Sequence, residues 1–137
     1  MRARSAIFCA VVLISTISCV HSEYAFIPDS NGSRLAIDSC LAPLGFSDES
    51  DGYSESIAND DSLVAVWVFP HPGLTSGRPT RTTAWVRKTG ARWEIHFFPG
   101  PSEAHIPPDI VPGFSNCIHE HGSLDVTWSS KVSPELR

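Results

Sequence analysis

Two cysteines lie on the apolar stripes of two segments with helical periodicity. In the first segment apolar residues recur at spacings i, i+3, i+4 and i+7, at Ile37, Cys40, Leu41 and Leu44. In the second segment the stripe consists of Ile110, Val111, Phe114, Cys117, Ile118 and His121. Because each cysteine shares a face with the apolar residues of its helix, we predict a disulfide between Cys40 and Cys117 that joins the two helices. This bond would close a loop of 117 − 40 = 77 residues.

The ends of both helices can also be predicted. Pro43 should end or kink the first helix near Ala42, and Gly45 supplies a turn. In the second helix Asp109 is suited to the N-cap position and Gly122 to the C-terminal stop.

Strand-like patterns separate and follow the two predicted helices. Residues 62–69 are apolar on both alternating faces, which is typical of a strand covered on both sides. Residues 82–98 form two strand-like runs around Thr89 and Gly90, a predicted hairpin turn. A last strand is predicted at residues 124–128. The order α-β-β-β-α-β predicts a small single α+β domain, with a mainly antiparallel sheet and both helices on one face.

The predicted hairpin has an apolar face and a mixed face. In the register that the turn implies, Trp85 opposes Glu94 and Arg87 opposes Arg92 on the mixed face. An aromatic side chain among guanidinium groups is a composition favoured in binding surfaces. The candidate binding residues are Trp85, Arg87, Arg92, Glu94 and His96. The alternative is that the C-terminal segment covers the tryptophan and that the arginines are only solvated.

The N-terminus indicates export. Two arginines in the first four residues precede an uncharged apolar run of about a dozen residues, as in a secretory signal peptide. The run is shorter than the roughly 20 residues that a membrane-spanning helix needs. We therefore predict a signal peptide at residues 1–18 and no transmembrane anchor.

The residues Thr16-Ile17-Ser18-Cys19 resemble the lipobox of bacterial lipoproteins, although that family usually has Leu where Thr16 stands. The resemblance implies cleavage before Cys19, acylation of Cys19 and, because Val20 rather than Asp follows, an outer-membrane lipoprotein that faces the periplasm. Residues 19–32 would then be a lipidated N-terminus and tether, and residues 33–137 the folded domain. The alternative is cleavage after Ser18 or Ser22 without a lipid, which gives a soluble periplasmic or secreted protein.

The number of cysteines supports the lipoprotein interpretation. Cys9 lies in the apolar run and would leave with the signal peptide. If Cys19 is acylated, or is removed by cleavage after Ser22, Cys40 and Cys117 remain as one pair in an oxidising compartment. An ordinary Cys19 in the mature chain would leave an odd thiol.

The charge balance excludes one class of partner. The chain has a net charge of −5, and loss of Arg2 and Arg4 with the signal peptide gives −5 − 2 = −7. Because nucleic-acid binding depends on basic surfaces, we expect no nucleic-acid partner. Six acids lie in residues 47–62, which we predict to be a solvated loop.

Catalytic and metal-binding patterns are incomplete. The zinc-protease pattern H-E-x-x-H fails because Ser123 follows His119 at the position of the second histidine. His119 and His121 would lie about 200° apart on a helix, too far apart to share one ion. The acidic segment fails as a calcium loop when Gly52 is set as its glycine, and there is no C-x-x-C redox motif. The sequence therefore predicts no cofactor and no metal ion.

These observations favour a lipid-anchored envelope protein that acts by binding a protein partner, as small inhibitors and immunity lipoproteins do. The analogy rests on size, export and the disulfide. A second hypothesis is a periplasmic hydrolase or metal-dependent enzyme, which requires His96, His119 and His121 to converge with acids in one pocket. A third is a structural subunit of an envelope assembly.

Overall fold

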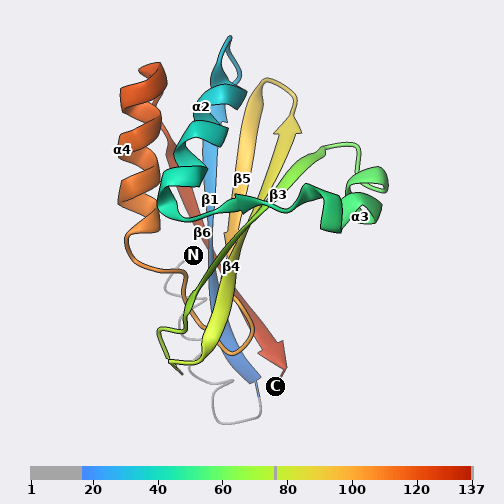
Figure 1. The fold of residues 1–137 in the computed structure, drawn as a ribbon, viewed down its shortest axis with the longest axis vertical. Coiled ribbons are helices and arrows are strands. Elements are labelled where there is room, and N and C mark those ends of the chain that lie inside the picture. The colour runs from blue at the N-terminus through green and yellow to red at the C-terminus, as the bar shows by residue number, and fades with distance from the viewer. Residues whose placement is uncertain (1–16, 76, 137) are drawn as a thin grey trace.

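A six-stranded antiparallel sheet organises the chain (Figure 1). The computed structural model describes residues 17–75 and 77–136, and within them the strand order is β2-β3-β4-β5-β1-β6. The strands are β1 (Ile17–Pro28), β2 (Ser47–Asp48), β3 (Leu63–Pro72), β4 (Pro79–Thr89), β5 (Arg92–Phe98) and β6 (Thr127–Leu136). The helices are α2 (Ser33–Leu41), α3 (Ser54–Ala58) and α4 (Ile110–Gly122), with the short 3-10 helices η1 (Ala42–Leu44) and η2 (Ser50–Tyr53). The predicted α+β class is confirmed.

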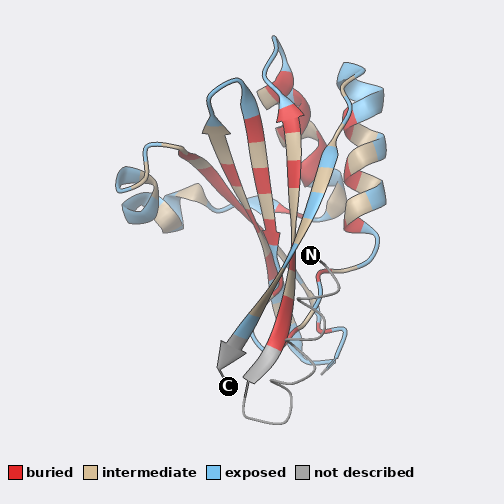
Figure 2. Cartoon of the chain, turned by 180° about the vertical axis from the view of Figure 1, so that it is seen from behind, coloured by how far each residue is buried: buried red, intermediate tan, exposed pale blue. Residues whose placement is uncertain are grey.

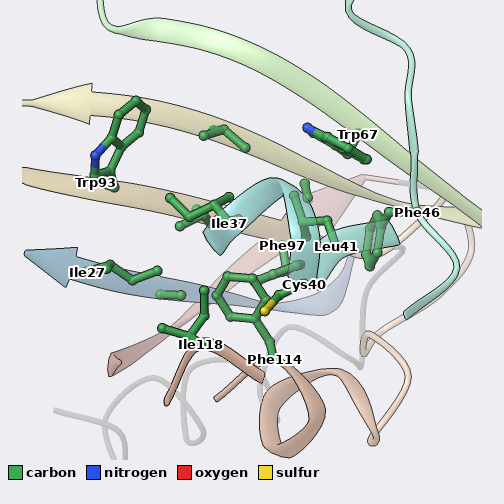
Figure 3. Packing of buried hydrophobic residues seen from close by; sticks show 14 of the residues in the cluster. Ile27, Ile37, Cys40, Leu41, Phe46, Trp67, Trp93, Phe97, Phe114 and Ile118 are labelled. Atoms are coloured by element: carbon green, nitrogen blue, oxygen red, sulfur yellow. The ribbon is translucent and has the colours of Figure 1, made fainter. Parts of the chain in front are cut away.

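Helices α2 and α4 pack together on one face of the sheet, and a Cys40–Cys117 disulfide joins them, as predicted. The Cα atoms of the two cysteines lie 5.6 Å apart. Figure 3 shows the core between these helices and the sheet, where Phe114 of α4 meets Phe97 of β5. Their ring centroids lie 5.4 Å apart at an interplanar angle of 71°, an edge-to-face contact that aromatic rings favour. The disulfide and this aromatic contact belong to the same core cluster.

The predicted helix ends agree closely with the structure. Helix α2 ends at Leu41, and Pro43 lies in η1, just beyond it. Gly45 has a φ of 107°, and a Cβ there would lie 2.6 Å from the ring of Phe69, so both the backbone and the packing require glycine. Helix α4 includes Gly122, the predicted stop. The left-handed residue that ends it is the next one, Ser123, with a φ of 51°.

Strand β1 replaces most of the expected tether. Residues 23–28 pair with β5 on one side and residues 17–26 pair with β6 on the other, and Ala25 and Ile27 are fully buried in the core. The segment 19–32, expected to be a lipidated N-terminus and tether, is therefore a strand as far as Pro28, and the folded domain begins with β1 instead of at residue 33. The loop residues after Pro28 suggested a flexible segment, but the alternation of side chains from Tyr24 to Ile27 is that of a strand. Only residues 29–32 form a connection between strand and helix.

The register of the β4–β5 hairpin also differs from the prediction. Thr89 pairs with Arg92, so Gly90 and Ala91 form the turn, and Arg87 opposes Glu94 instead of Arg92. Gly90 has a φ of 63°, which glycine adopts without strain, whereas the predicted turn put a β-branched threonine at that position. The shift is two residues along the ladder, so every side chain keeps its predicted face.

The C-terminal strand and the acidic segment also differ from the predictions. Strand β6 begins at Thr127, later than the predicted 124–128, although Leu124, Val126 and Trp128 do pack against the core. The acidic segment at residues 47–62 is largely exposed, as expected, but it contains β2, η2 and α3 rather than an irregular loop.

We expect removal of the helix-joining disulfide to lower the free energy of unfolding substantially. By chain entropy a loop of 77 residues contributes about 4 kcal/mol to folding stability. Urea denaturation of the Cys40→Ala/Cys117→Ala double variant should show this loss relative to the oxidised protein. The wild type under reduction is the control and should lose a similar amount. Equal midpoints for the oxidised and reduced wild type would contradict the prediction.

Candidate binding face

The sheet has a second face that α2 and α4 do not cover, which we call the open face. Figure 2 views the sheet from this side. Strand registers put the following residues on it: Tyr24 and Phe26 of β1, Arg81, Thr83, Trp85 and Arg87 of β4, Arg92, Glu94, His96 and Phe98 of β5, and Thr127, Ser129 and Lys131 of β6. All five residues proposed from the sequence as a binding surface therefore share one face. Their role in binding stays a prediction.

A row of rings crosses the centre of the open face. The Tyr24 ring stacks on His96 with a centroid distance of 4.1 Å and an interplanar angle of 6°. His96 lies opposite Trp85 in the β4–β5 register, and Phe98 lies edge-on to His96 at 5.6 Å. At the far side Tyr53 of η2 contacts Trp85 edge-on at 5.6 Å. The row therefore extends from β1 to η2 and is held by ring contacts within the molecule.

Arg87 is anchored beside this row. Its guanidinium lies 5.7 Å from the centroid of the Trp85 ring, and its Nε lies 3.5 Å from a carboxylate oxygen of Asp60. Glu94 is its neighbour across the β4–β5 ladder. These contacts hold the arginine in place without a ligand. The pKa of Asp60 is held below its usual range by hydrogen bonds from Ser62 and by the charge of Arg87.

Three other cations on the open face are exposed and carry no ion pair within the described chain: Arg81, Arg92 and Lys131. Arg92 lies 4.2 Å from the centroid of the Phe26 ring, a cation–π contact. Glu94 is the sole acid among the open-face residues named above, and the β1–β6 register adds position 135, a glutamate, to the same face. The four cations at positions 81, 87, 92 and 131 therefore outnumber the two acids. The open face is therefore basic in a chain whose net charge is −5.

Two hollows flank the row of rings, and each contains one exposed arginine. The larger, of about 960 Å³, is lined by Tyr53, Val68, Pro70 and Arg81 among others. The smaller, of about 510 Å³, lies beside Phe26 and Arg92. A side chain that enters either hollow would meet apolar walls and a guanidinium, and in the larger hollow it would also meet Glu49.

His96 is the most perturbed titratable group that the structure describes on this face. Burial among the neighbouring rings lowers its pKa from 6.5 to about 4, and the positive charges of Arg87 and Lys131 act in the same direction. Its buried Nε2 has no hydrogen-bond partner in the described part of the chain. The imidazole is therefore neutral at physiological pH and behaves as part of the aromatic row.

The structure does not bring His96, His119 and His121 together. His96 lies on the open face, whereas the other two lie in the last turn of α4, on the opposite side of the sheet. His119 lies 3.6 Å from Asp125. Among the described residues, the sole group of three potential metal ligands consists of Cys40, Cys117 and His121, and its two sulfurs are joined in the disulfide.

Several open-face residues were not predicted from the sequence. Tyr24 and Phe26 lie in the segment expected to be a tether, although their alternation with Ala25 and Ile27 is the signal of a strand. Tyr53 lies in the acidic segment, and its contact with Trp85 is a tertiary contact that no local pattern announces.

Cys19, the expected lipid attachment site, lies in β1 opposite Pro134 of β6. Its side chain is 8% exposed, and its sulfur is disulfide-bonded. A sulfur cannot carry a thioether-linked lipid and a disulfide at once, so acylation at Cys19 requires a mature chain in which this bond is absent. Acylation stays a prediction on that condition.

None of the helices in the described residues is both long and apolar enough to cross a membrane. Comparisons with protein families, characterised proteins and solved structures found no significant match.

The low pKa of His96 predicts acid sensitivity. In the unfolded chain the imidazole takes up a proton near pH 6.5, but in the folded protein only near pH 4. The unfolded state therefore binds more protons between these values, and folding stability falls as the pH falls through this window. His96→Gln should flatten this part of the profile, measured by urea denaturation at several pH values. His119→Gln, at an exposed position, is the control, and an unchanged profile for His96→Gln would contradict the prediction.

Proposed function

We propose that this protein is an exported binding module whose open face recognises an acidic segment of a protein partner. The observation that carries the proposal is the concentration of exposed cations on that face in an otherwise acidic chain. Because charge complementarity steers association and fixes orientation, a basic face on an acidic molecule favours an acidic partner. The acids of residues 47–62 lie beside the face and would repel an acidic segment that approached from the β3 edge.

The aromatic row supports the same proposal. Tyr, Trp and Arg are the residues that contribute most to protein–protein affinity when they lie at the centre of an interface. Here Trp85 and Tyr24 are half-buried and held by neighbouring rings, so little conformational entropy is lost when a partner covers them. The hollow at Arg92 would receive an acidic side chain, whereas Arg81 shares its hollow with Glu49 and would act on an acidic partner through its exposed charge.

Export is the second part of the proposal. The pairing of β1 with β6 favours cleavage before Cys19 over cleavage after Ser22. The first cut keeps eight of the ten β1–β6 residue pairs, from Cys19 to Phe26, whereas the second keeps four, from Glu23 to Phe26. A lipid on Cys19 would then place the end of the sheet directly at the bilayer surface, with no tether between them. A soluble periplasmic protein is the alternative.

A photo-crosslinking pair tests the binding face. A photoreactive residue at Ser129, exposed on the open face, should capture a partner in the envelope of the source cells, and one at Glu120, exposed on α4, should not. The partner peptide that carries the crosslink should be rich in Asp and Glu. Equal capture from both positions, or capture of a basic peptide, would reject the proposal.

Charge reversal measures the electrostatic part with the purified partner. Arg92→Glu and Arg81→Glu should each weaken binding by about tenfold or more and reduce its dependence on salt, while Arg92→Lys should weaken it less. Arg34→Glu, on α2, is the matched control off the face. The reversals leave folding intact if thermal denaturation midpoints stay within a few degrees. If the affinity is the same for wild type, Arg92→Glu and Arg81→Glu, the result would count against an acidic partner.

Intact mass of the membrane-extracted protein tests location. We expect a mature chain that begins at Cys19 and carries diacylglyceryl and acyl groups. A chain that begins at Cys19 without lipid would support the soluble alternative. A chain that begins at Glu23 would contradict the cleavage that the β1–β6 pairing favours.

A further inference from the structure

Three soft or borderline metal ligands meet where α2 and α4 are joined. The sulfurs of Cys40 and Cys117 and a ring nitrogen of His121 all lie within 4.8 Å of one another. Cys117 and His121 are four residues apart on α4, the spacing that puts two side chains on the same side of a helix. Cys40 faces them from α2. The fold therefore assembles a Cys, Cys, His triad from two helices.

In the oxidised protein this triad cannot hold a metal ion, because the sulfurs are bonded to each other and thiolates are the metal ligands. Reduction changes that. A dithiol reductant supplies two electrons and two protons, leaves Cys40 and Cys117 as thiols, and becomes a disulfide itself. Binding of a divalent ion to both sulfurs then releases the two protons, since cysteine binds zinc as the thiolate.

The distances suit a tetrahedral ion after small movements. With bonds of about 2.3 Å to sulfur and about 2.0 Å to nitrogen, ligand atoms around zinc lie roughly 3.5 to 3.8 Å apart. The nitrogen must approach by about 1 Å from its present limit of 4.8 Å, and the sulfurs must separate once their bond is broken. His121 is exposed, so its ring can move at little cost.

The surroundings leave room for a fourth ligand. His121 lines a hollow of about 180 Å³ between α2 and the end of α4, together with Ser39 and Leu124. Water can reach this hollow, and three protein ligands with one water complete a tetrahedral zinc site. Ser39 and Asn31 are the other polar side chains in the lining of this hollow.

We propose that reduction of the Cys40–Cys117 disulfide converts this position into a binding site for a thiophilic divalent cation such as Zn²⁺, with His121 as the third ligand. The ion would replace the covalent connection between α2 and α4. The proposal is independent of the function of the open face, which lies on the other side of the sheet.

Cobalt spectroscopy tests the site directly. The full mature protein is reduced with an excess of dithiothreitol under anaerobic conditions, freed of reductant, and titrated with Co²⁺. We expect one ion per chain, with thiolate-to-cobalt charge-transfer absorption and intense tetrahedral ligand-field bands that Zn²⁺ abolishes. The oxidised protein should show neither. Absence of these bands in the reduced protein, or their presence in the oxidised one, would overturn the proposal.

The contribution of His121 separates this site from two unstructured thiols. His121→Ala should weaken Co²⁺ binding by at least about tenfold. Substitution of a residue that only supports a metal ligand already lowers affinity by about tenfold or more, and loss of the ligand itself should cost at least as much. His119→Ala, on the other side of the helix, is the matched control and should bind as the wild type. Equal binding by the His121→Ala variant, or equal binding in concentrated urea, would show that the fold does not assemble the site and would overturn the proposal.

A stability measurement covers the case in which the reduced chain unfolds. Zn²⁺ should raise the thermal midpoint of the reduced wild type, or refold it, because an ion that binds only the folded state stabilises that state. It should not raise the midpoint of the reduced His121→Ala variant to the same extent. Equal shifts in the two proteins would reject the third ligand.

Discussion

The packing of α2 and α4, joined by a disulfide, against one face of the sheet determines the remainder of the architecture. The two helices bury the rings of Phe97 and Phe114 and seal the core on that side. In residues 17–75 and 77–136 no second helical layer covers the opposite face beyond the short η2–α3 segment, whose Tyr53 contacts Trp85. Side chains there can leave water only by packing on one another. The half-buried row of rings is the result of this one-sided construction.

That self-packing explains both the chemistry of the open face and its suitability for binding. The rings of Tyr24 and Phe98 withdraw His96 from water, and nearby cations oppose its protonation, so the imidazole stays neutral. Arg87 is held by Asp60 and Trp85, whereas the Arg92 side chain is exposed to solvent. A surface that is rigid at its centre and charged at its margins has the composition of many recognition surfaces, because a partner gains contact area without having to order it.

The local parts of this fold were predictable and the nonlocal parts were not. The helical stripes around Cys40 and Cys117 repeat within a few residues, and their coincidence on two helices was enough to predict the disulfide. The hairpin faces were also predictable, since period-two alternation survives a shift of two residues. The register depends on whether glycine is the first or the second residue of the turn, and the alternation pattern of the strands does not distinguish these two positions. The contact of Tyr53 with Trp85 arises from tertiary folding and has no local pattern.

Strand β1 connects the proposed export of this chain with its folding. It lies between β5 and β6, so it must pair with residues near 95 and near 130 that are far away in sequence. Each pairing closes a long loop, and its entropy must be offset by contacts that form late. The hairpin of β4 and β5 is local and can form without β1, whereas β6 gains its only strand neighbour in the described sheet from β1. A cut within β1 would therefore remove the support of β6 first. The proposed cleavage before Cys19 keeps the pairs from Cys19 to Phe26 and so costs β6 less of this support than cleavage after Ser22 would.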